Sequence, residues 1–292
     1  MASSSTTTQP LLDHIVILVP HSFLISPPDW FTNDKLFTFY PGGRHADGLT
    51  ENTLVLLADG SYIEFIAFVP GIDPTKRGGH KWGREKEGTV IDWALTLPSS
   101  AGSGLGEQTR TFGNFQQQVR DTRTGITYAD LVPGGRHRPD GEELKWAVAA
   151  AYVDGGEPVE PGLLPFWCLD DTRRGLRVPY QQDGVTRHAT GAVGIALVSV
   201  TPDAQDEAEN LDKVYDALLG EDATSGDDSL WDLKTLDGEK LHAGGQVRLE
   251  AVAEHAKLSL AFFTDLREFE GRTIGGKVTD DVELKFEFVS AR

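Results

Sequence analysis

The sequence predicts an α+β fold in which a βαβββ unit occurs twice in tandem and a further α+β unit follows. Short runs of apolar and β-branched residues, closed by proline or glycine, indicate strands, and few stretches have the 3.6-residue periodicity of a helix. The pentapeptide Pro-Gly-Gly-Arg-His occurs at 41–45 and at 133–137, each time at the end of a predicted strand and shortly before an Asp-Gly pair. Identity over five residues at equivalent places indicates an internal repeat.

The first unit is expected over about residues 12–70. Its four strands are predicted at 12–20, 37–45, 53–58 and 62–69. The first strand closes on Pro20, and the last two are joined by Asp59-Gly60, a pair typical of a tight hairpin. Pro27 and Pro28 interrupt the segment between the first two strands, so no good helix is expected there.

The second unit is expected over about residues 88–170. Its strands are predicted at 89–98, 126–132, 144–153 and 163–169. Phe112, Phe115 and Val119 fall on one face of a helix predicted over 112–121. The order of strand, helix and three strands then matches the first unit, and the second Pro-Gly-Gly-Arg-His again follows a strand.

The rest of the chain is expected to form a tail, two linkers and a third unit. Residues 1–11 are rich in Ser and Thr and lack the basic and apolar regions of a signal peptide, which predicts a disordered tail. Residues 71–88 and 171–191 are expected to be linkers. The third α+β unit, 192–292, has a strand predicted at 192–200, a helix at 206–219 and strands near 247–253, 258–264 and 282–289.

The net charge of −18 argues against nucleic acid and against an anionic membrane surface as partners, because both would repel the chain. The charge is uneven, since residues 201–232 hold eleven acidic side chains and one basic one. A solvated helix face or an acidic docking surface would each explain that segment. A small molecule is the expected partner, and a homodimer is left open.

The cysteine count and the hydropathy pattern restrict the class of protein further. Cys168 is the only cysteine, so an intramolecular disulfide is excluded, and the thiol is expected to be inert core. No apolar run reaches the ~20 residues that a membrane span needs. These features predict a cytoplasmic protein.

Two ionisable residues lie inside predicted strands. His14 is in Leu-Asp-His-Ile-Val and Glu64 is in Tyr-Ile-Glu-Phe-Ile, both among apolar neighbours. A buried carboxylate must be paired, protonated or bound to a metal. If the two strands are neighbours, the pair forms either a structural hydrogen bond or part of a site for zinc, iron, manganese or nickel.

The ordered set of motifs resembles the glyoxalase-like domain family of the vicinal oxygen chelate superfamily. The resemblance covers roughly residues 12–200. The segments that carry it are Leu12–His14, Gly42–His45, Thr50–Asn52, Gly60–Phe65, Asp92–Leu95, Arg138–Trp146 and Leu164–Phe166. It implies a cup formed by two βαβββ units, in which each unit of a metal-dependent member offers a His on its first strand and a Glu on its last.

The first unit keeps both of these ligands, as His14 and Glu64, whereas the second unit departs from the pattern. Aligning Asp13-His14 with Asp92-Trp93 puts Trp93 in place of the second His, and the matching alignment puts Phe166 in place of the second Glu. One divalent metal or none is therefore expected, with His188 as a candidate third ligand if its loop folds over the cup.

Other residues of the same segments are candidates for binding or catalysis. Trp93, Phe166 and Trp146, with Trp167 and Tyr62, form either an apolar substrate cup or ordinary core. The Arg of either repeat copy could hold a substrate carboxylate. The predicted catalytic residues are His14, His45 and Glu64, and the predicted substrate-binding residues are Arg44, Asn52, Trp93, Arg136, His137, Trp146 and Phe166.

The resemblance favours a small-molecule enzyme, namely a lyase, an isomerase or a ring-cleaving oxygenase acting on a small, partly apolar metabolite. A bound metal would stabilise an enolate or oxyanion on adjacent substrate oxygens. Without a metal, Glu64 would be the general base and Arg44 or Arg136 the anion stabiliser. The alternative is a non-catalytic protein that sequesters an apolar metabolite in the same cup.

Overall fold

The computed structural model describes residues 9–31, 35–98, 104–138, 140–221, 229–242, 244–250 and 257–292. Most of the expected disordered tail, residues 1–8, lies outside the described residues, and the first strand begins at Leu11. Among the helices of the described ranges, none has the length and apolar character needed to cross a membrane.

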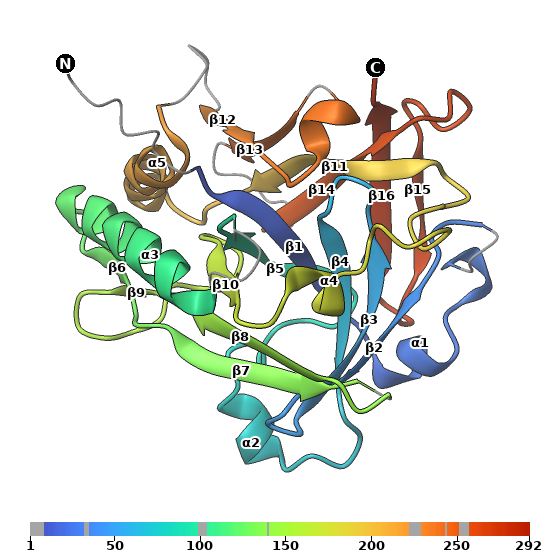
Figure 1. The fold of residues 1–292 in the computed structure, drawn as a ribbon, viewed down its shortest axis with the longest axis horizontal. Helices are drawn as coiled ribbons and strands as arrows, with labels where there is room; N and C mark the ends of the chain where they lie inside the picture. The colour runs from blue at the N-terminus through green and yellow to red at the C-terminus, as the bar shows by residue number, and fades with distance from the viewer. Residues whose placement is uncertain are drawn as a thin grey trace.

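The larger of the two main sheets has eight strands in the order β2-β3-β4-β1-β5-β10-β8-β7 (Figure 1). Its first half contains β1 (Leu11–Leu18), α1 (His21–Ile25), η1 (Asp29–Phe31), β2 (Tyr40–Arg44), β3 (Thr50–Leu56) and β4 (Tyr62–Phe68). Its second half contains β5 (Thr89–Thr96), α3 (Gly104–Asp121), β7 (Val132–His137), β8 (Glu143–Ala149) and β10 (Phe166–Asp170). The α+β fold with tandem βαβββ units is confirmed.

The halves join through β1 and β5, which are antiparallel, while β1 pairs in parallel with β4 and β5 with β10.

The boundaries of the predicted helix and strands of the second unit differ from those in the structure. The helix of the second unit begins at Gly104, eight residues before its predicted start at 112. The predicted strands at 126–132 and 144–153 are each divided, because β6 (Ile126–Tyr128) and β9 (Ala151–Val153) form a separate two-stranded sheet.

The two copies of the repeated pentapeptide meet and nearly close the eight-stranded sheet. They lie on β2 and β7, the two edge strands, and His45 forms an isolated antiparallel bridge with Arg136. The Ala46 amide donates to the Gly135 carbonyl over 3.1 Å. The edges thereby satisfy part of their exposed backbone hydrogen-bonding groups, and the sheet curves into a barrel-like cup.

Residues from 192 onward form a six-stranded sheet in the order β12-β13-β11-β14-β16-β15. It is built from β11 (Ala192–Val200), α5 (Gln205–Leu219), β12 (Ser229–Leu233), η2 (Gly238–Lys240), β13 (Gly245–Leu249), β14 (Leu258–Thr264), β15 (Thr273–Lys277) and β16 (Glu283–Ser290). β11 pairs in parallel with β13 and antiparallel with β14, as β1 does with β4 and β5. The additional C-terminal α+β unit is therefore present, and its six strands fall into two groups of three, β11 to β13 and β14 to β16. Residues 251–253 of the predicted strand at 247–253 fall outside the described ranges.

One continuous apolar core lies between the outer face of the larger sheet, the helices α3 and α5, and one face of the smaller sheet. Ile15 and Phe65 contribute to it from the first half, Trp93 and Phe112 from the second, and Phe262 from the smaller sheet. Burial of these large side chains is the main term that holds the two sheets together. The inner face of the cup has separate, smaller clusters and is left partly open.

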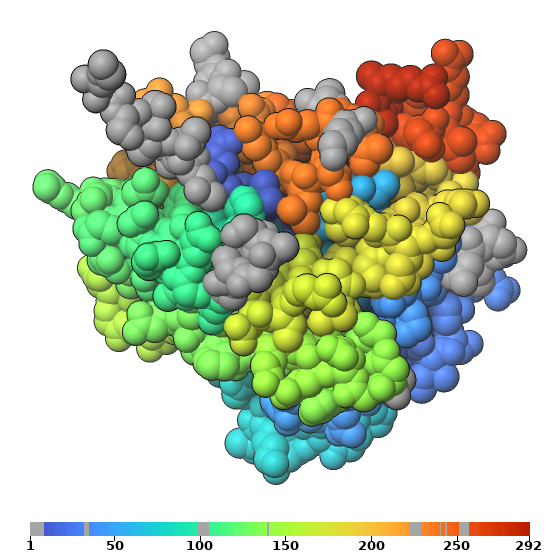
Figure 2. All heavy atoms as spheres, in the orientation of Figure 1, coloured from blue at the N-terminus to red at the C-terminus, as the bar shows by residue number. Residues whose placement is uncertain are grey.

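Both predicted linkers contain short helices, α2 (Pro74–Gly78) and α4 (Arg174–Arg177). Figure 2 shows residues 171–191, in yellow, as a band across one face between the green part of the larger sheet and the orange segment above it. α4 places Arg177, which is buried, against the inner end of the cup.

Candidate functional site

A cavity of about 330 Å³ opens inside the cup of the eight-stranded sheet. Its walls are apolar where Trp82, Trp146, Val148 and Phe166 face it. Polar or ionisable side chains also line it, among them His14, His45, Asn52, Tyr62, Glu64, Lys81, Arg136 and Arg177. The polar groups of the cavity are therefore concentrated beside a broad apolar surface.

The two repeat copies present different side chains to this cavity. On β2 the pairing skips Gly42, since Pro41 lies opposite Thr53 and Gly43 opposite Asn52. This extra residue is a β-bulge, which reverses the alternation of faces that follows it. A Cβ at Gly42 would overlap Asn52, so glycine is required there.

As a result, His45 lines the cavity, whereas Arg44 is 55% exposed and its Nη2 donates to the Gly48 carbonyl over 2.9 Å. β7 has no such shift in its pairing with β8, so Arg136 lies inside at 4% exposure and His137 is exposed. The structure brings His45 and Arg136 to the cavity and leaves Arg44 and His137 outside it.

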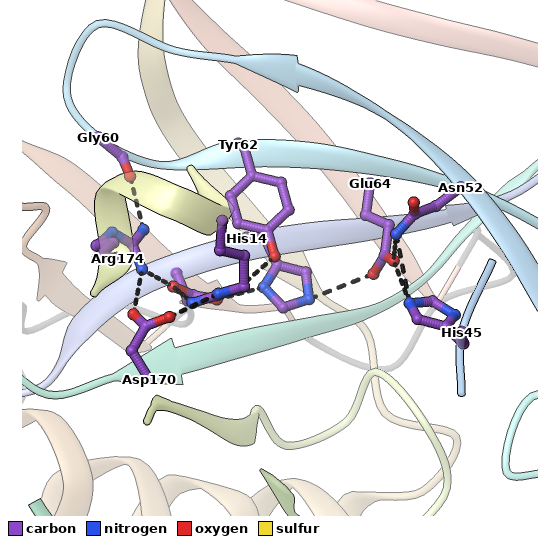
Figure 3. A network of polar contacts seen from close by, with 10 residues as sticks. His14, His45, Asn52, Gly60, Tyr62, Glu64, Asp170 and Arg174 are labelled. Atoms are coloured by element: carbon purple, nitrogen blue, oxygen red, sulfur yellow. Dashed lines mark hydrogen bonds and ion pairs between the residues drawn. The ribbon is translucent and has the colours of Figure 1, made fainter. Parts of the chain in front are cut away.

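Glu64 is the carboxylate at the centre of the polar group (Figure 3). The Asn52 amide donates to its Oε1 over 2.5 Å and is itself oriented by the Gly43 amide, which donates to Asn52 Oδ1 over 2.9 Å. Nε2 of His14 lies 3.5 Å from Oε2, and Nε2 of His45 lies 3.5 Å from Oε1. Two imidazoles thus flank one buried carboxylate.

The orientation of His14 is fixed from behind. Its Nδ1 donates to Asp13 Oδ2 over 2.6 Å, and its ring stacks on Tyr62 with centroids 4.6 Å apart. Burial alone would raise the pKa of Asp13, but the adjacent guanidinium groups of Arg174 and Arg177 outweigh burial and hold that pKa well below its usual range. Asp13 is therefore ionised and accepts the hydrogen on Nδ1 of His14, which leaves Nε2 turned toward Glu64.

The linker helix α4 supplies the charges that hold Asp13. Arg174 Nη1 donates to Asp13, and Arg177 bonds Asp13 at 3.0 Å, Asp170 at 2.7 Å and the Tyr62 hydroxyl at 2.7 Å. The sequence does not predict this network, because the segment 171–191 has the composition of a linker. The signal was present in Arg174 and Arg177 spaced three residues apart, which places both on one helix face.

Asp13, His14 and Cys168 have ligand atoms within 4.8 Å of one another, close enough for a metal ion. Both oxygens of Asp13 already accept hydrogen bonds from arginines, and burial raises the pKa of the Cys168 thiol well above its ordinary value. The Nε2 of His14 and the carboxylate of Glu64 are the more favourable donors, because neither faces an arginine at hydrogen-bond distance among the described residues.

Trp93 and Trp167, which were both candidates for the apolar lining of the cup, lie in the outer core and away from the cavity. In the register of β1 with β5, His14 lies opposite Ala94, and Trp93 lies opposite Ile15. Side chains opposite each other share a face, so the aligned position is off by one residue and Trp93 points into the outer core. There its indole donates to the Gly162 carbonyl over 3.2 Å.

The other aromatic predictions have different outcomes. Phe166 pairs with Ala94 and its ring lies edge-on to His14, with centroids 5.3 Å apart. Trp146 also lines the cavity. The basic loop after α2 contributes Lys81, whose Nζ lies 2.8 Å from Asp92 and 3.8 Å from the centre of the Phe166 ring.

His188 is not available as a metal ligand. Its Nδ1 accepts from the Thr38 amide over 3.0 Å, and its Nε2 donates to the Leu56 carbonyl over 2.9 Å. Burial lowers its pKa to about 4. Both ring nitrogens are used, so the residue ties the linker 171–191 to the first unit, and the expectation that it ligates a metal is not supported by this geometry.

Comparisons with solved structures place the fold. A hypothetical protein from Staphylococcus aureus matches with a TM-score of 0.65 at 14% identity, over 96% of this chain and 100% of that one, which shows a shared fold over nearly the whole chain. More distant matches are a glyoxalase I mutant from Zea mays (TM-score 0.33, 14% identity, 83% and 68% covered) and 2,2',3-trihydroxybiphenyl 1,2-dioxygenase from Sphingomonas wittichii (0.40, 10%, 97% and 91%). At these scores the last two add nothing further.

Comparisons of sequence place the family. No curated protein matches the chain significantly. A family model described as a glyoxalase-like domain matches residues 12–217, more than half of the chain. The match extends from β1, which carries His14, through the linker with α4 and into α5. The chain therefore belongs to the glyoxalase-like domain family.

Proposed function

We propose that the chain is a small-molecule enzyme of the vicinal oxygen chelate type, a lyase, isomerase or ring-cleaving oxygenase, and that Glu64 exchanges the proton in its reaction. The observation that carries the proposal is the buried Glu64 carboxylate with two imidazole Nε2 atoms 3.5 Å away, at the side of a cavity large enough for a metabolite. A merely structural carboxylate would not need two imidazoles or an open cavity.

The residues around Glu64 support a role in proton transfer. Asn52 holds one carboxylate oxygen, so the other oxygen keeps a fixed direction. His45 Nδ1 and the Thr50 hydroxyl are hydrogen-bonded over 2.7 Å, which fixes the imidazole ring. A carboxylate that is held in one orientation beside an apolar wall can accept a proton with little rearrangement of its surroundings.

The same donors fit a divalent cation. His14 donates from Nδ1 to Asp13 and directs Nε2 toward a Glu64 oxygen 3.5 Å away, and a pair of donor atoms at this spacing fits a cation between them. His14 and Glu64 would hold the ion, with His45 as the nearest further donor. Such an ion would act as a Lewis acid toward substrate oxygens.

Among the described residues, the second unit adds no histidine or free carboxylate opposite this pair. Ala94 lies opposite His14 on β5, Phe166 and Cys168 line the cavity from β10, and Asp92 is engaged by Lys81 and Trp82. A set of four protein ligands, two from each unit, is therefore absent among the described residues. The donor set of two histidines and one carboxylate leaves coordination positions for a substrate.

A metal titration and a proton-exchange assay test the proposal together. Wild-type protein is titrated with Mn²⁺, Fe²⁺, Ni²⁺ and Zn²⁺ by calorimetry, and hydrogen exchange into the carbon acid 3-phenylpyruvate is followed by NMR in D₂O. We expect binding of about one equivalent of metal in the wild type and a loss of at least about tenfold in affinity in His14→Ala. Glu64→Gln should abolish exchange, and His188→Gln, which is remote from the cavity, should retain metal binding.

The competing function is sequestration, which the apolar wall of Trp82, Trp146 and Phe166 would serve. Protein that binds an aromatic ligand, binds no metal and gives the same exchange rate in wild type and Glu64→Gln would establish sequestration and overturn the enzyme proposal.

A further inference from the structure

Arg136 is a buried cation at the wall of the cavity. It is 4% exposed, and its Nη1 has no hydrogen-bond partner in the part of the chain that the structure describes. The other cations at the cavity differ in this respect, since Lys81 lies 2.8 Å from Asp92 and Arg177 lies 2.7 Å from Asp170. Of these three cations, Arg136 is the one whose charged group has no carboxylate within ion-pair distance among the described residues.

Such a group is unfavourable in the empty protein. Burial lowers the pKa of Arg136, and the Glu64 carboxylate opposes that effect only through space. An unpaired buried charge costs folding free energy, and it becomes favourable when a ligand of opposite charge binds beside it. Glycine at position 43 lets β2 approach the guanidinium closely, because a Cβ there would lie only 3.2 Å from Arg136 Nη1.

The charge balance of the cavity indicates a monoanion. Arg136 contributes one uncompensated positive charge, and a planar guanidinium matches the two oxygens of a carboxylate. Glu64 would repel a second negative charge on the ligand. The flat side chains of Trp146 and Phe166 on the same cavity fit an apolar body, and a planar one in particular.

We infer that Arg136 binds the carboxylate of a small monocarboxylic substrate whose apolar body lies against Trp146 and Phe166. The inference rests on the proposed function in one respect: the substrate would bind in the same cavity, with the rest of the molecule directed toward Glu64. The carboxylate site itself does not depend on turnover.

Binding of three matched probes tests the inference without any reaction. The probes are 3-phenylpropanoate, its neutral analogue 3-phenylpropanamide and the dianion phenylphosphate, measured by calorimetry on the full chain. We expect the wild type to bind the carboxylate at least about tenfold more tightly than the amide. Arg136→Met should reduce this preference to about twofold or less, and Arg136→Lys should give an intermediate value.

Arg44→Met is the matched control, because it changes the same position of the other repeat copy and lies outside the cavity. It should leave the preference for the carboxylate unchanged. Equal binding of carboxylate and amide by the wild type, a preference for phenylphosphate, no binding of any probe, or a preference that persists in Arg136→Met would overturn the inference.

Stability gives an independent measurement. Without ligand, Arg136→Met should unfold at a higher urea concentration than the wild type, since it removes an unpaired buried charge and keeps an apolar side chain. A lower midpoint would show that Arg136 has a structural partner and would overturn the inference. If Arg136 governs carboxylate binding but Glu64→Gln and His14→Ala change neither exchange nor metal binding, the carboxylate site stands and the proposed enzyme fails.

Discussion

His188 should weaken the fold as it becomes protonated, and His188→Gln should remove that dependence on pH. The imidazole is buried between the first unit and the linker, where Nδ1 accepts from Thr38 and Nε2 donates to Leu56. Protonation would place a hydrogen on Nδ1 against the Thr38 amide hydrogen, so the hydrogen bond would be lost and a charge would be buried. Glutamine can accept and donate in the same directions and does not titrate.

The magnitude follows from the pKa difference between the folded and unfolded states. Burial lowers the pKa of His188 to about 4 in the folded protein, against about 6.5 in the unfolded chain. The unfolded state binds more protons between these values, so the contribution to stability is fully present above about pH 6.5 and is lost as the pH falls toward about 4. At about 1.4 kcal/mol for each pH unit, the total is about 3 kcal/mol.

Urea denaturation of the wild type and of His188→Gln at several values between about pH 7 and about pH 4.5 measures this contribution. The difference in unfolding free energy between the two proteins should shift in favour of the variant by roughly 2–3 kcal/mol over that range. The exposed His137, replaced in His137→Gln, serves as the matched control and should follow the wild type. Parallel curves for wild type and His188→Gln would refute the argument.

Three further changes test the network, the core and the bulge. Arg177→Met should lower the free energy of unfolding by about 3–5 kcal/mol, because it removes one of the two arginines that neutralise Asp13. Urea denaturation at neutral pH measures this loss, and a loss below about 1 kcal/mol would contradict the prediction. Trp93→Ala should lower the free energy of unfolding by a similar ~3–5 kcal/mol, because it creates a cavity in the core. The folded variant should still bind 3-phenylpropanoate as tightly as the wild type does, and weaker binding would place Trp93 at the site. Gly42→Ala should displace Asn52, reducing both stability and the exchange rate, and unchanged values of both would contradict the bulge.

Local sequence signals predicted the fold class and the position of the polar centre well. Alternating and continuous apolar runs predicted the strands that carry His14 and Glu64, because strand patterning is a property of a few neighbouring residues. The repeated Pro-Gly-Gly-Arg-His pentapeptide predicted two related units, and these are the two halves of the eight-stranded sheet. The presence of both copies did not reveal that they would bridge the sheet edges.

The predictions that failed depended on register or on distant contacts. Trp93 was placed one residue out of phase, because the pairing of β1 with β5 involves irregularities that the sequence does not display. His188 was considered as a ligand since its loop had no predicted place, and the structure uses it to connect the linker to Thr38 and Leu56. The acidic segment 201–232 carries no tested role, and its residues 222–228 lie outside the described ranges.

By itself, the sequence determined the α+β class, the internal repeat and the presence of His14 and Glu64 inside two strands of the first unit, since all three follow from residue order and side-chain period. Only the tertiary structure decided which copy of an identical pentapeptide offers its histidine and which its arginine. The physical reason is the bulge at Gly42, which shifts β2 by one residue against β3, so His45 turns inward there while Arg136 turns inward on the regular strand β7. A single extra residue in one ladder thereby gave the cavity a second imidazole, in addition to the arginine that the regular strand supplies.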